Sequence, residues 1–225
     1  MLLDFAGWTN AAWDHKDPCA EEWRAIHHRL DEAGLGSYIE DYLSRLRELE
    51  SRRPSVGGDH RRFDEVRSYR EAVARLSLAA VTAVAMNADS LEEGIHATRF
   101  DCDVGTLFRI LMQCQIIDDV LDYPADRSAS LPSFLTASAL LPQAVELTAG
   151  AARSYGASLE RSSARAVLPL RMALMVVTAV TKLVVRLFPL WNVTFARRAG
   201  PHDGGRHGAG MFRRWIGRRT TTSAR

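Results

Sequence analysis

Apolar residues return at steps of three and four along almost the whole chain, which is the spacing of one face of an α-helix. No alternating run of apolar and polar residues bounded by turn residues predicts a strand. The pattern therefore predicts an all-α protein. Proline and glycine stops divide it into helices expected near residues 2–13, 21–30, 38–53, 60–86, 90–99, 103–123, 142–165 and 169–188.

The sequence predicts both ends and the buried side of the helix expected over residues 103–123. Asp103 is its predicted N-cap, and the helix is expected to end at Tyr123-Pro124, because proline cannot continue a helix. A loop is expected over residues 126–130. The predicted buried side of this helix consists of Leu107, Ile110, Leu111, Cys114, Ile117 and Leu121.

The length and charge of the chain indicate one globular body with a basic tail. With 225 residues, 47% of them hydrophobic, the chain can bury one substantial core, which we expect to form a single domain over residues 1–196. Residues 197–225 hold eight arginines and one aspartate, a composition that predicts disorder. This tail carries +7, so the remaining body carries −5. An acidic body argues against a nucleic-acid-binding core, because phosphate recognition needs clustered cations.

The cysteines and the absence of a leader pattern indicate a cytoplasmic protein. The three cysteines are widely spaced and form no CxxC pair, which fits a reducing compartment. No secretory signal opens the chain. The longest uncharged apolar stretch, Met172 to Thr181, is well short of the roughly 20 residues that cross a membrane. A packed core helix is the favoured interpretation, and contact with a membrane surface is the alternative.

Three aspartates crowd the end of the helix expected at residues 103–123: Asp118, Asp119 and Asp122. Residues three or four apart are neighbours on a helix surface, so these carboxylates repel one another. They also lie in the last turns, where the helix dipole favours cations. A bound ion would compensate them, and Mg²⁺ prefers carboxylate oxygens completed by water and substrate phosphate. A solvated helix end without an ion is the alternative.

Helical rotation predicts where these carboxylates point. At about 100° per residue, Asp118 and Asp122 align with Leu111, Cys114 and Gln115, the side expected to face other helices. We therefore expect Asp118 and Asp122 to point into a cleft, with Asp126 one turn further on, where it would contact either the metal directly or one of the metal's ligands.

The stretch Gln115-Ile-Ile-Asp-Asp-Val-Leu-Asp-Tyr123, followed by Leu131-Pro132, resembles the second aspartate-rich motif of trans-polyprenyl diphosphate synthases. The spacing of Asp122, Asp126, Arg127 and Leu131-Pro132 also resembles the squalene/phytoene synthase branch of the class I isoprenoid synthase superfamily. The helix from Tyr69 to Met86 is similar to the central helix that precedes this motif in that branch. The resemblance covers residues 64–136 and is specific mainly at residues 115–132.

This resemblance implies an antiparallel helical bundle around a central apolar pocket. Two aspartate-rich helix ends would face each other across its mouth and hold Mg²⁺ against a substrate diphosphate. Asp118, Asp119 and Asp122 would be the metal ligands and catalytic residues, and Gln115 would line the substrate side. The position of the first motif is matched only by Trp13-Asp14-His15-Lys16-Asp17, in which Asp14 and Asp17 keep a DxxD pattern. A simple helix stop before Pro18 is the alternative for that segment.

Three residues of the helix expected at residues 60–86 complete the predicted site. Arg70 and Arg75 are suited to clamp a diphosphate by forked hydrogen bonds, and Tyr69 is a further polar group near the pocket. The alternative is that the arginines are surface or interhelical charges.

The leading hypothesis is a Mg²⁺-dependent isoprenoid biosynthesis enzyme that condenses or cyclises an allylic prenyl diphosphate. The rival is a non-catalytic helical protein that binds an isoprenoid or a partner protein through a degenerate metal site. A third alternative is a membrane-surface protein without a ligand. The expected partners are a prenyl diphosphate, no nucleic acid and, through the basic tail, a peripheral membrane; a homodimer is left open.

Overall fold

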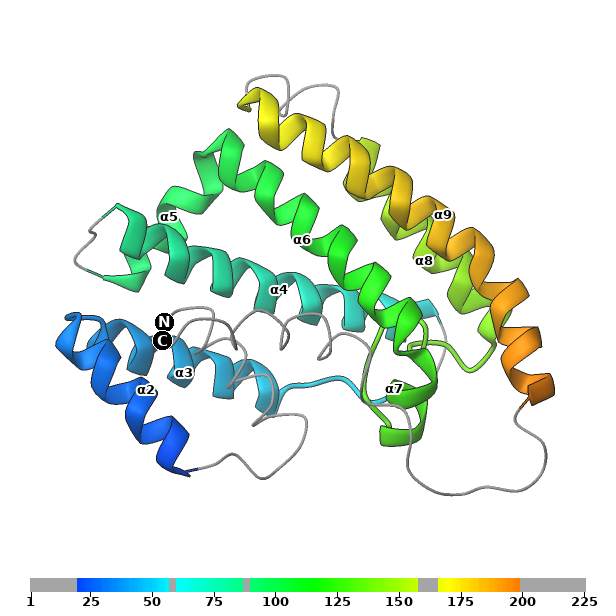
Figure 1. The fold of residues 1–225 in the computed structure, drawn as a ribbon, viewed down its shortest axis with the longest axis horizontal. Helices are drawn as coiled ribbons and strands as arrows, with labels where there is room; N and C mark the ends of the chain where they lie inside the picture. Colours follow the sequence, from blue (N-terminus) through cyan, green and yellow to red (C-terminus); the bar gives the residue numbers. More distant parts are fainter. Residues whose placement is uncertain (1–19, 57–59, 87–89, 158–165, 199–225) are drawn as a thin grey trace, which may run out of the picture. The chain divides into compact units, whose positions relative to one another are not determined.

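The computed structural model describes residues 20–56, 60–86, 90–157 and 166–198 (Figure 1). Within these ranges every regular element is a helix and none is a strand, so the all-α prediction is confirmed. The helices are α2 (Ala20–Glu32), α3 (Gly36–Ser51), α4 (His60–Ala85), α5 (Leu91–Phe100), α6 (Cys102–Leu121), α7 (Tyr123–Ala129), α8 (Leu141–Ala157) and α9 (Leu168–Arg198). The helix predicted at residues 2–13 and the basic tail beyond Arg198 lie outside the described residues.

Most predicted helices are confirmed, and the differences lie at their ends. The N-cap of α6 is Asp101 and not Asp103, since Asp101 Oδ1 accepts hydrogen bonds from the amides of Asp103 and Val104 at 2.7 and 3.1 Å. The loop predicted over residues 126–130 is wrong for most of its length, because α7 continues to Ala129. Pro124 lies in the first turn of α7, where a missing N–H costs nothing. Helix α9 runs past Pro189 to Arg198, ten residues beyond the predicted end.

The chain divides into two compact units, and α4 and α6 contribute residues to both. The first unit contains residues 1–52 and 71–108, and the second contains residues 53–70 and 109–225. The single domain predicted over residues 1–196 stays a prediction.

The first unit is held by two apolar clusters. Helices α2 and α3 pack against each other, and the cluster between them consists of Ile26, Leu30, Ile39 and Leu43, each at most 5% exposed. A second cluster joins α3 to α4 and α5 through Leu46, Leu76, Ala79 and Leu91. Burial at three- and four-residue steps along α3 confirms the periodicity expected there. Apolar burial on one face of each helix thus accounts for this unit.

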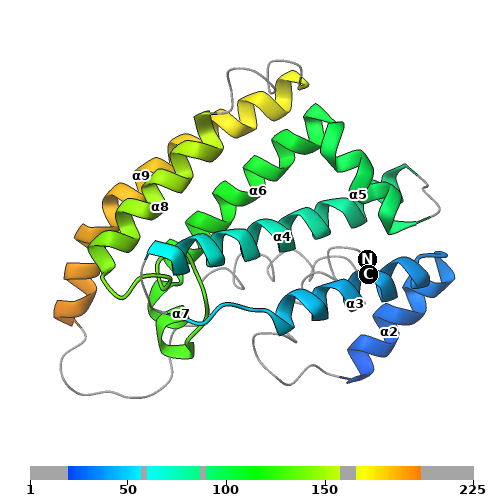
Figure 2. The same ribbon diagram turned by 180° about the vertical axis from the view of Figure 1, so that it is seen from behind.

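The second unit contains α8 and α9, which run side by side in opposite directions in both views (Figures 1 and 2). The face that α8 buries is made largely of small residues: Ala144, Thr148, Ala151, Ala152, Tyr155 and Gly156. Helix α6 joins this pair through Gln113, which is fully buried. Its Nε2 donates to the Ala152 carbonyl at 2.8 Å and to Thr178 Oγ1 at 3.4 Å.

The buried side predicted for α6 is wrong. Leu107, Cys114 and Leu121 are exposed, and the buried residues of α6 are instead Thr106, Met112, Gln113, Ile116, Asp119 and Val120. Three of these, Thr106, Gln113 and Asp119, are polar. Each makes a hydrogen bond that lowers the cost of its burial, while Gln113 Oε1 has no partner among the described residues.

Gly94 allows α5 to approach α4 closely. A Cβ added there would lie 2.3 Å from the Ala79 carbonyl oxygen and 2.8 Å from Ala83 Cβ. Gly94→Ala is therefore expected to lower the free energy of unfolding by about 1–3 kcal/mol, since neither atom can move without shifting α4. The matched control is Gly105→Ala on α6, where an added Cβ meets nothing within 4 Å. That variant should gain about 0.5–1 kcal/mol from helix propensity. Urea denaturation measures both, and equal effects would contradict the close crossing.

Candidate functional site

The residues from Asp118 to Asp126, called here the acidic segment, join α6 to α7 through Asp122, whose φ of −95° and ψ of 6° depart from helical values, while i to i+4 backbone hydrogen bonds continue across it. The Asp122 amide donates to the Asp118 carbonyl at 2.8 Å, and the Asp126 amide donates to the Asp122 carbonyl at 2.9 Å. Ser130, in the left-handed conformation with φ of 53°, then ends α7. Asp118, Asp122 and Asp126 therefore follow one another at intervals of about one helical turn.

Asp119 points the other way, into the core of the second unit. Its side chain is 4% exposed and accepts two short hydrogen bonds. Arg70 Nη2 donates to Oδ1 at 3.0 Å, and the Phe134 amide donates to Oδ2 at 2.7 Å. The same Arg70 nitrogen donates to the Pro132 carbonyl at 3.1 Å. This buried ion pair links α4, the end of α6 and the segment after α7.

The segment after α7 is tightly built around this pair. All residues from Pro132 to Ser138 are buried. Thr136 Oγ1 accepts a hydrogen bond from the Ser133 amide at 2.8 Å and donates to the Leu131 carbonyl at 2.7 Å. The Phe134 ring packs on Phe63 of α4, with ring centroids 5.8 Å apart. The amide that binds Asp119 is therefore held in place from both sides.

The acidic segment, with its four aspartates, and Arg70 together carry more negative than positive charge. Burial raises the pKa of Asp119 to about 6, although Arg70 and the Phe134 amide oppose this shift. Burial and the neighbouring Asp119 raise the pKa of Asp126 to about 7, and burial also raises the pKa of Asp122. Burial would lower the pKa of Arg70, but attraction to the Asp119, Asp126 and Asp118 carboxylates outweighs it, so that pKa is raised.

The predicted metal ligands do not share one environment. Asp118 and Asp122 are exposed, Asp126 is half-buried and Asp119 is buried. The prediction that Asp118 and Asp122 lie on a buried side of α6 is wrong, because Cys114, on the same side, is exposed as well. Among the described residues, no three His, Cys, Asp or Glu side chains are grouped to hold a metal ion.

The remaining predicted site residues have varied positions. Arg70 joins the acidic segment, as described above, but as an internal ion-pair partner. Gln115 is half-buried, and its Oε1 atom is buried without a hydrogen-bond partner among the described residues. Tyr69 is half-buried on α4. Arg75 belongs to the first unit, where its guanidinium lies 4.2 Å from the centre of the Phe108 ring. The predicted ligands Asp14 and Asp17 lie outside the described residues.

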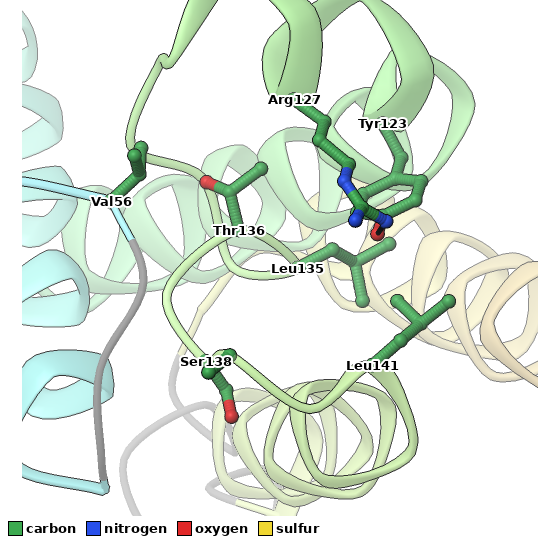
Figure 3. A pocket seen from close by; sticks show the side chains of 8 residues that line it. Val56, Tyr123, Arg127, Leu135, Thr136, Ser138 and Leu141 are labelled. Atoms are coloured by element: carbon green, nitrogen blue, oxygen red, sulfur yellow. Dashed lines mark hydrogen bonds between the residues drawn. The ribbon is translucent and has the colours of Figure 1, made fainter.

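A cavity of about 200 Å³ lies beside α7, between Tyr123, Arg127 and the loop that precedes α8 (Figure 3). Arg127 extends along Tyr123 there and donates to its hydroxyl at 3.0 Å. None of the four aspartates lines this cavity. Its volume is below the roughly 300–1,000 Å³ of ligand pockets. We therefore do not identify it with the predicted central apolar pocket, which stays a prediction.

Sequence reasoning missed the polar groups that arrange this region. Gln113 was not singled out, and the Phe134 amide and Pro132 carbonyl have no signature in the side-chain pattern. The available signal was the Leu131-Pro132 pair, which the motif places after the aspartates.

Comparison of the chain with protein-family models, curated proteins and solved structures gives no match.

The Arg70–Asp119 pair is expected to be strongly coupled. Arg70→Met should lower the free energy of unfolding by about 3–5 kcal/mol, because it leaves the buried Asp119 carboxylate without its partner. Asp119→Ala should cost less, because the Arg70 side chain that it leaves is 26% exposed. The double variant should lose clearly less than the sum, by about 1–3 kcal/mol. Denaturant titrations of the three variants measure this coupling. As a control, Glu92→Ala breaks an exposed ion pair with Arg45 and should cost less than about 1 kcal/mol. Additive single effects would show that the pair does not organise this region.

Asp126 should make stability depend on pH. Its folded pKa of about 7 is above the ordinary value of 3.8, so the folded state binds the proton more tightly than the unfolded state. The resulting stabilisation is complete below about pH 4 and is lost as the pH rises through about 7. Asp126→Asn, which mimics the protonated form, should therefore gain stability relative to wild type between about pH 4 and 8. Urea denaturation in the presence of a chelator tests this, and a constant difference across that range would contradict it.

Proposed function

We propose that this chain is a class I isoprenoid-type enzyme that uses Mg²⁺ to act on an allylic prenyl diphosphate, which it condenses or cyclises. The observation that supports this most directly is the pair of exposed carboxylates, Asp118 and Asp122, one helical turn apart at the end of α6. They belong to the segment that resembles the second aspartate-rich motif of that superfamily.

Two accessible carboxylates are enough for this ion. Mg²⁺ usually keeps several waters and is bound by one or two carboxylates together with substrate phosphates, so a cage of three protein ligands is not required. Asp118 and Asp122 fit that role, with half-buried Asp126 next to them. Asp119 does not fit it, because both of its oxygens already accept hydrogen bonds inside the core. When bound, Mg²⁺ would supply positive charge that stabilises the departing diphosphate.

The other residues of the region have supporting parts in this proposal. Arg70 and the Phe134 amide fix Asp119, which fixes the rotation of the end of α6. Asp118 lies about 100° around the helix from this anchor, and both Asp118 and Asp122 are exposed. Gln115 lies one turn before Asp118 and offers an amide to the same region.

A non-catalytic protein that binds an isoprenoid or a partner is the second candidate. The observation in its favour is that Asp119, a metal ligand by resemblance, is committed to Arg70. Such a protein would keep the helical fold without the full set of ligands. It would not release diphosphate from a bound substrate.

Thermal unfolding with Mg²⁺ and inorganic diphosphate tests the metal site. The melting temperature should rise when both are present, and Asp118→Asn or Asp122→Asn should reduce the rise to a small fraction, since each removes one of two ligands. The matched control is Glu146→Gln, which removes an exposed charge from α8 in the same unit and should keep the full rise. The proposal fails if wild type shows no rise, or if all three variants behave alike. Release of diphosphate from prenyl diphosphates then separates the enzyme from the binding protein.

A further inference from the structure

Helix α9 has an exposed apolar side. Six of its apolar side chains are each at least half exposed and fall within an arc of about 100° when the helix is viewed along its axis. We call them the outer face of α9: Leu168, Met172, Met175, Val176, Leu183 and Leu190. An isolated exposed apolar residue is ordinary, but a continuous stripe along one helix marks an interaction surface.

The opposite side of α9 is already used. Leu174, Thr178, Thr181, Val185 and Phe188 are buried, and the side that they form is centred about 150° from the centre of the outer face. Phe188 packs edge-on against Tyr123, with ring centroids 5.4 Å apart. Thr181 Oγ1 lies 3.4 Å from the Gln113 carbonyl oxygen, to which it donates. The helix is thus docked in the second unit by one side and presents the other outward.

The charges of α9 indicate what the outer face binds. Its 31 residues include no acidic residue. Arg171, Lys182 and Arg186 are exposed, and the helix ends in Arg197-Arg198. By helical rotation Arg171 and Lys182 lie beside one edge of the outer face, and Arg186 lies within it. An apolar stripe whose only charges are positive is complementary to hydrocarbon that lies beneath negative charge. That combination is found at the surface of a bilayer that contains anionic lipids.

We infer that the outer face of α9 is a membrane-binding surface on which the protein rests in the plane of an anionic lipid bilayer. The segment Leu168–Leu190, with mean hydropathy of 1.8, is by length and composition also able to cross a membrane. Crossing would place Lys182 near the middle of the hydrocarbon and would expose Thr178 and Thr181 to lipid, both of which are costly. Lying in the plane keeps the threonines packed and lets the long cationic side chains reach the headgroups.

Sedimentation of the full-length chain with lipid vesicles tests this inference. The protein should bind vesicles of phosphatidylcholine mixed with phosphatidylglycerol, and bind more weakly to phosphatidylcholine alone. Binding should fall at about 0.5 M NaCl, where charges are screened within a few ångströms. Met172→Ser combined with Leu183→Ser should lower the partition coefficient at least about tenfold, because two apolar side chains no longer enter the lipid. Lys182→Gln combined with Arg186→Gln should lower binding to the anionic vesicles about tenfold as well.

The matched control is Val81→Ser combined with Met86→Ser, which changes two residues that are 55% and 58% exposed but lie outside α9. It should bind like wild type. Absence of wild-type binding to anionic vesicles would overturn the inference, as would equal binding by the α9 variants, which would assign binding to another segment. A dimer that the Met172→Ser/Leu183→Ser variant abolishes would also overturn it, because a second copy would then cover this face. The assay contains neither Mg²⁺ nor diphosphate, so its outcome is independent of the proposed function.

Discussion

The arrangement of the second unit depends on one buried ion pair, between Arg70 and Asp119. Burying two opposite charges gives little net stability, because the cost of removing them from water offsets their attraction. Leaving the buried Asp119 carboxylate without half-buried Arg70 is far more costly. The pair therefore specifies an arrangement: α4, the end of α6 and the Pro132–Phe134 segment must meet where Arg70 finds both the carboxylate and the Pro132 carbonyl.

This constraint divides the aspartate-rich segment into two kinds of residue. Adjacent side chains on a helix differ in direction by about 100°, so fixing Asp119 inward also fixes the direction of Asp118, which is exposed. Asp122, one turn after Asp118, follows it to the accessible side because the backbone hydrogen bonds continue between them. One carboxylate thus holds the fold from inside, and Asp118 and Asp122 are exposed to solvent. The repulsion among Asp118, Asp119 and Asp122 is weaker because Asp119 is buried while the other two are exposed.

The fold class and most helix positions could be predicted because helical periodicity is a local property. The register of α6 could not, because its buried face includes Gln113 and Asp119. These two polar residues are tolerated only through partners far along the chain, such as Ala152 for Gln113 and Arg70 for Asp119. Periodicity gives no information on such partners. Helix α7 was missed for a different reason: Pro124 was interpreted as a stop, although proline also fits the first turn of a new helix.

Helix α9 shows the limits of apolar periodicity most clearly, because both of its sides are rich in apolar residues. Its inner side buries Thr178 and Thr181 among apolar residues, whereas its outer side exposes Leu168 and Leu190. Core packing cannot explain that distribution, since burial alone would favour the threonines outside and the leucines inside. On the inner side, Thr178 and Thr181 are small and hydrogen-bond with Gln113 of α6. The outer side can therefore contact a different, apolar environment. The absence of acidic residues along α9 fits an environment that carries negative charge.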